Sequence, residues 1–304
     1  MKKVLLTGAS GFIGRQTIPF LLKNGYEVHA VFYPEKTGLD DEHNLFWHRC
    51  NLLNPDEQKE LLLKIKPDNL MHFSWYTTPD KYWNSFENLR WVGASLELVI
   101  NFVENGGRRA IFAGSCAEYD WNYEYCSEES TPLNPATVYG TCKKSLYELL
   151  KSYAKQSGLS FAWGRVFFLY GPYEHPARLV SSAIISLLKN KPFACSHCNQ
   201  LRDFLFVQDV AEAFVSLLES KLEGAVNIGS GKPVALKAIV DSLAKQLGRP
   251  ELIEFGKVTV STNEPVLLAA DIKRITKELG WKPKYGLQKG LLLTIDWWRD
   301  NLKR

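Results

Sequence analysis

Short apolar runs alternate with longer amphipathic stretches through the first half of the chain, a pattern typical of strands separated by helices. The predicted strands are Val4–Thr7, Glu27–Phe32, Leu70–Phe73 and Ala110–Ala113, and the predicted helices include Phe12–Lys23 and Trp83–Glu104. Asn54, Pro55 and Glu57 mark another helix start, with a capping side chain, a proline at the first position and a glutamate that can reach back. The alternation predicts βαβ crossovers and a parallel sheet covered on both faces.

After Phe168 the regular alternation of strands and helices ends, and short strands and helices mix with proline-containing loops. The prediction is an α/β fold, in which a doubly wound parallel sheet of the Rossmann type carries a smaller C-terminal α/β substrate-binding region. We expect a cofactor-binding domain over 1–168, to which the chain returns near 200–230, and a mainly substrate-binding domain over 169–304. The ligand is expected at the carboxyl ends of the parallel strands.

Composition adds few constraints. The 304 residues and 45% hydrophobic content are ample for a large core. Charge is mixed along the chain, with 37 basic and 33 acidic residues, so neither a nucleic-acid nor a membrane surface is indicated. Gly8 and Gly11 interrupt the first apolar run too early for a signal peptide, and no stretch approaches the ~20 apolar residues of a membrane span. A cytoplasmic protein is expected.

Six cysteines in a chain of this length do not indicate a disulfide framework. Cys195 and Cys198 form a CxxC with His197 between them, but zinc would need a second ligand pair at comparable spacing, and the sequence shows none. No metal site is predicted.

Gly8, Gly11 and Gly14 follow the first predicted strand and open a helix. The early glycines permit a tight turn and let backbone N–H groups approach a pyrophosphate. The last glycine lets the helix pack closely on the sheet, so this turn predicts a dinucleotide site.

The end of the second predicted strand bears on which dinucleotide is bound. An NAD site usually has a carboxylate there that binds the ribose 2′-hydroxyl, whereas this chain has Phe32. Arg15 and Lys36 could supply positive charge to a 2′-phosphate, with exposed surface positions as the alternative. NADP(H) is therefore favoured, and NAD(H) stays open.

Ser115, Tyr139 and Lys143 form a candidate catalytic trio. Ser115 follows a predicted strand, and Tyr139 and Lys143 lie one turn apart on the next helix. A carbonyl that accepts a hydride needs a proton donor and a hydrogen bond at its oxygen. An ammonium group ~4 Å from the phenol would stabilise the phenolate by about 4 kcal/mol at an effective dielectric constant of about 20. We therefore expect Lys143 to lower the pKa of Tyr139 toward neutrality.

The sequence resembles the extended short-chain dehydrogenase/reductase superfamily, in its nucleotide-sugar epimerase, dehydratase and reductase branch. The motifs that carry the resemblance are TGASGFIG at 7–14, AGSCAEY at 113–119, YGTCK at 139–143, RVFFLYGP at 165–172, LRDFLFVQDVA at 201–211, VNIGSG at 226–231 and ELGWKP at 278–283. They span nearly the whole chain, and they are specific for the superfamily but not for one reaction.

The resemblance and the residue patterns together suggest a set of contacts. The expected cofactor contacts are Gly8, Ser10, Gly11, Phe12, Ile13, Gly14, Arg15, Phe32, Lys36, Asn51, Leu52, Phe73, Ser74, Trp75, Tyr139 and Lys143. The expected substrate contacts are Ser115, Cys116, Glu118, Tyr139, His175, Arg178, Leu179 and Arg202. Arg202 resembles the arginine that binds the substrate diphosphate, with a salt bridge to Asp203 or Asp209 as the alternative.

Departures from the family pattern narrow the reaction. Sugar 4,6-dehydratases of this kind carry Asp-Glu after the catalytic serine or threonine, and this chain has Cys116 and Ala117 instead. The asparagine common before Tyr-Gly-Pro is absent from Phe167–Leu169, and Ser261–Pro265 holds no arginine, so diphosphate binding is expected to be rearranged. His175 resembles a catalytic histidine of GDP-fucose synthases, but their cysteine would fall at Ala117, so His175 is either a substrate contact or a loop residue.

The leading prediction is an NADPH-dependent 4-ketoreductase acting on a nucleotide-linked 4-keto-6-deoxy sugar, such as a dTDP- or GDP-linked hexose, with Tyr139 as proton donor. The alternatives are an NAD-dependent nucleotide-sugar 4-epimerase and, less favoured, a non-catalytic dinucleotide-binding protein. Trp83–Glu104 and Thr141–Tyr153 resemble the helices of a four-helix bundle in family dimers, so a homodimer is expected.

Overall fold

A sheet of seven parallel strands forms the centre of the molecule, in the order β12-β7-β5-β4-β1-β2-β3. The structure is a computed structural model that describes residues 2–34, 43–259 and 264–302. The strands are β1 (Lys3–Thr7), β2 (Glu27–Phe32), β3 (Leu45–Arg49), β4 (Asn69–His72), β5 (Arg109–Ser115), β7 (Ser160–Val166) and β12 (Gly224–Ile228). The order reverses direction at β1, so the carboxyl ends of β1 and β4 flank a switch point where ligands bind in such sheets.

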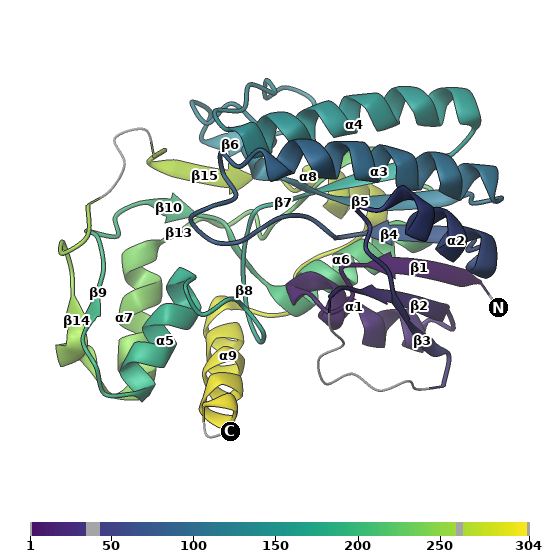
Figure 1. Ribbon diagram of the computed structural model, residues 1–304. Coiled ribbons are helices and arrows are strands. Elements are labelled where there is room, and N and C mark those ends of the chain that lie inside the picture. The colour runs from purple at the N-terminus through teal and green to yellow at the C-terminus, as the bar shows by residue number, and fades with distance from the viewer. Residues whose placement is uncertain (1, 35–42, 260–263, 303–304) are drawn as a thin grey trace.

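Helices cover both faces of this sheet (Figure 1). One face is covered by α1 (Phe12–Lys23), α6 (Val207–Glu219) and α8 (Lys273–Leu279), and the other by α2 (Pro55–Ile65), α3 (Glu87–Glu104) and α4 (Val138–Ser157). Neighbouring residues of β1 alternate between the two sides, because Val4 and Leu6 pack against α1 and α6 while Leu5 packs with α2 and α3. The predicted doubly wound α/β fold is confirmed.

The second half of the chain builds a smaller layer beside the sheet (Figure 1). Its core joins α5 (Leu179–Leu188), α7 (Leu236–Leu247) and α9 (Leu287–Asn301). The short elements are β6 (Tyr125–Cys126), β8 (Phe168–Tyr170), β9 (Phe193–Ala194), β10 (Leu201–Arg202), β11 (Phe204–Phe206), β13 (Val234–Ala235), β14 (Ile253–Glu254), β15 (Leu267–Ala270), η1 (Cys116–Glu118) and η2 (Pro250–Leu252). Because α6 and β12 pack in the first layer, the chain crosses between the two layers more than once.

Two helix starts differ from the sequence prediction. The predicted helix over Trp83–Glu104 begins only at Glu87, since the preceding loop is held against α4, where the backbone N–H of Tyr139 donates to the Trp83 carbonyl oxygen at 2.9 Å. Helix α4 itself begins earlier than predicted, at Val138, because the Thr137 side chain caps it by accepting from the Gly140 N–H at 3.1 Å. The loop and the start of α4 therefore form one unit around Tyr139.

The start of α2 follows the prediction in part. Asn54 caps the helix by accepting from the Asp56 N–H, and Pro55 takes the first position. In a capping box Glu57 would accept from the N–H of the N-cap residue Asn54. Its carboxylate instead accepts from the Asn51 N–H at 2.7 Å. Within the described part of the chain, no helix is both long enough and apolar enough to cross a membrane.

Candidate active site

Ser115, Tyr139 and Lys143 meet at the carboxyl end of β5. Ser115 is the last residue of that strand, and Tyr139 and Lys143 lie in the first turns of α4. The Ser115 side chain lies near enough to Tyr139 for hydrogen bonding to favour the phenolate, and Lys143 Nζ donates to the Ala113 carbonyl oxygen at 2.9 Å. The structure therefore brings the predicted trio together.

The electrostatics of the trio differ from the expectation. Burial raises the pKa of Tyr139, with Tyr82 adding to the rise and the hydrogen bond from Ser115 opposing it. Burial also lowers the pKa of Lys143 to about 7. The expected lowering of the Tyr139 pKa by Lys143 is wrong for this structure, because the ammonium group is directed to Ala113 and lies over an indole ring instead of beside the phenol.

Aromatic side chains enclose Tyr139. Tyr82 lies edge-on at 4.9 Å and Trp83 at 5.8 Å between ring centroids, while Trp121 contacts Trp83 at 5.9 Å. Trp75, an expected cofactor contact, lies 6.5 Å from the Tyr139 ring. The sequence analysis missed Tyr82, Trp83 and Trp121, although aromatic residues are dense between 75 and 83.

The glycine turn has the close packing that the sequence predicts. Gly8 has a φ of +65°, and a Cβ there would approach Ser74 N to 2.8 Å. A Cβ on Gly14 would lie 2.2 Å from the Gly8 carbonyl oxygen. Gly11 is the N-cap of α1 and provides no capping side chain, so the first N–H groups of the helix remain for a ligand. This cradle fits a pyrophosphate, and its walls include Phe12 and Ile13 of α1 and Phe73 and Ser74 after β4.

Arg15 does not lie where the 2′-phosphate prediction requires it. Its guanidinium lies 4.1 Å from the ring centroid of Tyr173 and donates to the Ser10 carbonyl oxygen at 3.3 Å. The cation at the end of β2 is Arg49, which pairs in register with Phe32 and lies 5.2 Å from the Tyr33 ring centroid. The sequence analysis missed Arg49 because it comes from the neighbouring strand. Lys36 lies outside the described residues.

Two of the expected cofactor contacts, Asn51 and Leu52, lie just beyond β3. Asn51 closes a turn by accepting from the Leu53 N–H at 3.1 Å. Leu52 borders a pocket of about 500 Å³ that also includes Arg90 and Gly93 of α3.

Arg202 is buried and already paired. It donates to Glu264 at 3.0 Å and to the Leu201 carbonyl oxygen at 2.9 Å. The salt-bridge alternative is correct in kind but wrong in partner, because the Asp203 carboxylate accepts from backbone N–H groups after β12 and Asp209 accepts from those before α9. Glu264 lies in the segment where the family resemblance implies an arginine.

Of the other expected substrate contacts, Cys116, Arg178 and Leu179 are buried or half-buried, whereas His175 is exposed. Cys116 is buried close to Arg202, and the Arg178 guanidinium lies 5.4 Å from the centroid of the Tyr82 ring. Leu179, the first residue of α5, follows Arg178 and is half-buried. His175 is exposed, and its Nδ1 accepts from the Ala177 N–H at 3.1 Å.

Glu118 is not placed to contact a substrate. Its side chain is fully buried, and its carboxylate forms an ion pair of 2.7 Å with Arg165. This corrects its place among the expected substrate contacts, since burial behind β5 separates it from any ligand above the strand end.

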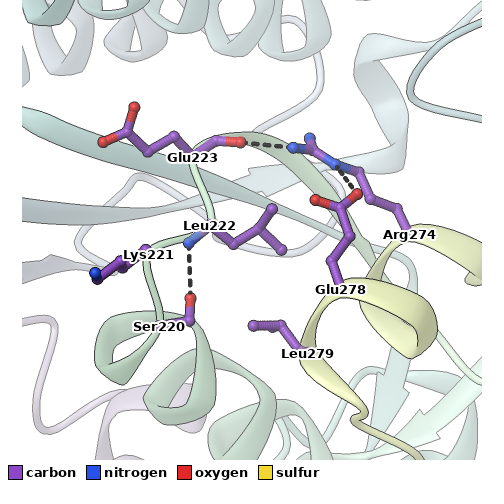
Figure 2. A pocket seen from close by; sticks show the side chains of 7 residues that line it. All are labelled: Ser220, Lys221, Leu222, Glu223, Arg274, Glu278 and Leu279. Carbon is purple, nitrogen blue, oxygen red and sulfur yellow. Dashed lines mark hydrogen bonds and ion pairs between the residues drawn. The ribbon is translucent and has the colours of Figure 1, made fainter.

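A pocket of about 470 Å³ lies at the other edge of the sheet (Figure 2). Its lining residues are Ser220, Lys221, Leu222, Glu223, Arg274, Glu278 and Leu279. The first four immediately precede β12 and the other three lie on α8, so the pocket is at the amino end of that strand, whereas Ser115 is at the carboxyl end of β5. Arg274 donates to the Glu223 carbonyl oxygen at 2.8 Å and to Glu278 at 3.1 Å, which leaves little of its guanidinium for a ligand.

All six cysteines are free and buried. Cys195 Sγ donates to the Glu254 carbonyl oxygen at 3.9 Å, and Cys198 Sγ lies 3.7 Å from Ser196 Oγ. Among the described residues no three or more His, Cys, Asp or Glu side chains are grouped to hold a metal ion.

Comparison with known proteins agrees with this architecture. Residues 4–229 match the model of the family described as NAD dependent epimerase/dehydratase. A putative UDP-glucose 4-epimerase of Methanocaldococcus jannaschii is 30% identical, covering 98% of this chain and 99% of the relative. UDP-glucuronic acid decarboxylase 1 of Xenopus tropicalis is 26% identical over 99% of this chain and 73% of its own length.

Solved structures give the same fold. UDP-glucose 4-epimerase of Thermotoga maritima superposes with a TM-score of 0.88 at 22% identity, covering 99% of both chains. MoeE5 in complex with UDP-glucuronic acid and NAD superposes with a TM-score of 0.87 at 29% identity, covering 98% of this chain and 99% of MoeE5. The chain thus belongs to the NAD dependent epimerase/dehydratase family and is an oxidoreductase-type enzyme of the extended short-chain dehydrogenase/reductase branch.

Proposed function

We propose that this enzyme is an NADPH-dependent 4-ketoreductase that acts on a nucleotide-linked 4-keto-6-deoxy sugar. The bound nicotinamide cofactor supplies the hydride. Tyr139 protonates the developing alkoxide, Ser115 holds the carbonyl oxygen by hydrogen bond, and Lys143 binds the cofactor ribose. The glycine turn holds the pyrophosphate, and Arg202 exchanges its contact with Glu264 for one with the substrate diphosphate.

The end of β2 is the observation that carries the choice of cofactor. The strand ends at Phe32, and the next described residues are Tyr33 and Pro34, so within the described part of the chain no carboxylate follows the strand end to bind a ribose 2′-hydroxyl. Arg49 lies beside Phe32, and its guanidinium donates to the exposed Pro34 carbonyl oxygen at 3.4 Å and lies 5.2 Å from the centroid of the Tyr33 ring. A cation at this edge favours a 2′-phosphate over a 2′-hydroxyl.

The proposed reaction is tested by NADPH oxidation with dTDP-, GDP- and CDP-linked 4-keto-6-deoxy sugars, with the product configuration read by NMR. Stoichiometric NADPH consumption with one of these sugars is expected. The Tyr139→Phe variant should lower kcat by about 10²–10⁴-fold, because it removes the proton donor while keeping the ring that packs on Tyr82 and Trp83. Unchanged turnover in this variant would refute the assignment.

A second candidate is an NAD-dependent nucleotide-sugar 4-epimerase. It is favoured by the name of the 30% identical relative and by the NAD in the MoeE5 complex. An epimerase regenerates its cofactor, so NAD retained through purification, together with interconversion of UDP-sugars and no net NADPH oxidation, would select this candidate over the reductase.

We also propose a cytoplasmic homodimer and a functional division near residue 168 between cofactor and nucleotide-sugar binding. The dimer is supported by apolar side chains that remain exposed on α3 and α4, which lie side by side (Figure 1). Leu89 and Ile100 are exposed on α3 and are separated by three helical turns, so they share one face, and Leu149 is exposed on α4.

A further inference from the structure

The carboxylate of Glu118 lies directly beneath the trio. Glu118 Oε1 accepts from the backbone N–H of Ser115 at 2.8 Å and from Trp163 Nε1 at 2.9 Å. Its other oxygen accepts from Arg165 Nε at 2.7 Å. All of these hydrogen bonds come from buried or half-buried donors, which fixes the position of the carboxylate.

This network determines how the Ser115 hydroxyl points. Glu118 holds the backbone N–H of Ser115, while Ser115 Oγ accepts from the Ala117 N–H at 3.1 Å. Oγ keeps its own proton to donate, and hydrogen bonding by Ser115 lowers the pKa of Tyr139 against the larger effect of burial. Gly114 provides the space, since a Cβ there would lie 2.0 Å from Trp163 Nε1 and 2.7 Å from the Glu118 carboxylate.

The same carboxylate faces Lys143. Both charged groups lie against the indole of Trp163, which hydrogen-bonds Glu118 and has the ammonium group 5.8 Å from its ring centroid. Lys143 is only 5% exposed, and no carboxylate of the described residues lies within ion-pair distance of it.

The other groups around Lys143 bring no negative charge at neutral pH. They are His72 on β4 and Cys142 on α4, with Tyr139 one turn away on the same helix. The pKa of His72 is lowered to about 3, so it is neutral, and the pKa values of Tyr139 and Cys142 are raised. Burial opposes the charge on Lys143, and the negative charge of Glu118 is the largest influence that favours it.

We propose that Glu118 is a positioning residue of the active site: its buried carboxylate aligns Ser115 with Tyr139 and supplies negative charge that favours the ammonium form of Lys143. The inference rests on the proposed function for its catalytic consequence, because an ammonium group at Lys143 is what holds the cofactor ribose. It depends on the geometry around β5 and not on the identity of the sugar.

The test compares Glu118→Gln with the double variant Glu118→Gln/Arg165→Met. The first removes the negative charge and nearly keeps the shape, and the second also removes the buried positive charge that Glu118→Gln would leave unpaired. Glu128→Gln is the matched control, since Glu128 is a largely buried glutamate that accepts from the Asn227 N–H, away from the trio.

The first readout is the titration of Lys143 followed by the ¹³Cε shift in lysine-labelled protein, with the signal assigned by its loss in Lys143→Arg. Wild type and Glu128→Gln should titrate at the same pH. Both Glu118 variants should titrate at least one pH unit lower, which is about a tenfold change in the proton-binding constant. A double variant that returns to the wild-type midpoint would show that unpaired Arg165 caused the shift, and would overturn the proposal.

The second readout is the pH profile of kcat. The alkaline limb of both Glu118 variants should move to lower pH, so that turnover is lost about tenfold at pH 8 and largely recovers at pH 6. A uniform loss at every pH would indicate a purely structural role and would refute the electrostatic part. If the wild type turns over no keto-sugar, the proposed function fails, whereas the NMR titration still decides the role of Glu118.

Discussion

The ammonium group of Lys143 lies 3.7 Å from the ring centroid of Trp75. Its one recorded hydrogen bond within the described chain is to the Ala113 carbonyl oxygen. A buried cation held by an aromatic face and one carbonyl is incompletely solvated, and this explains why the pKa of Lys143 falls to about 7. The site therefore holds a group whose charge depends on pH near neutrality.

Lys143→Met should stabilise the ligand-free protein at low pH. The wild-type lysine carries its full burial penalty below pH 7, and the penalty is relieved as pH rises from 7 toward the unfolded-state pKa of 10.5. The variant should thus be more stable than wild type by about 1–4 kcal/mol at pH 6, and this gain should shrink by pH 9.5. Urea unfolding at both pH values measures it, and a gain that is independent of pH would contradict the prediction.

Arg49→Ala should weaken NADPH binding about tenfold and leave NADH binding unchanged, because only NADPH carries the 2′-phosphate that Arg49 is proposed to bind. Fluorescence titration of each reduced cofactor measures the two dissociation constants. Arg299→Ala, at an exposed arginine of α9, is the control for a lost surface charge. Equal weakening of NADPH and NADH binding would show that Arg49 does not act on the 2′-phosphate.

Gly114→Ala should destabilise the protein by about 1–3 kcal/mol, because the new methyl group would overlap Trp163 and the Glu118 carboxylate. Gly93→Ala is the matched change, since a Cβ at that position in α3 meets nothing within 4 Å and should stabilise the helix by up to about 1 kcal/mol. Thermal unfolding distinguishes the two. Equal effects would mean that the space beneath Ser115 is less restricted than the structure indicates.

Leu89→Glu should dissociate the proposed homodimer, because it introduces a charge into the apolar face of α3. Light scattering coupled to size exclusion should show a mass near 34.6 kDa for the variant and twice that for the wild type. Leu63→Glu changes a similarly exposed leucine on α2 and should remain dimeric. A monomeric wild type would refute the dimer directly.

Local patterns in the sequence were sufficient for the fold and for the position of the trio. The alternation of apolar strands and amphipathic helices, and the glycines that open α1, depend on neighbouring residues and on backbone geometry. Ser115 at a strand end and the YxxxK spacing of Tyr139 and Lys143 then predict their meeting at one edge of the sheet. The helix starts at Glu87 and Val138 were less predictable, because the contact between Trp83 and Tyr139 joins distant segments.

Tertiary structure alone decided the electrostatics of the site. Arg15 lies on Tyr173 while Arg49 reaches the end of β2, and Arg202 pairs with Glu264, contacts between residues far apart in the sequence. The raised pKa of Tyr139 follows from burial among aromatic rings supplied by separate loops. The sequence by itself determined which chemical groups are present and near which strand ends they lie. Their charges and partners depend on burial and on contacts made across the fold, and no local pattern contains that information.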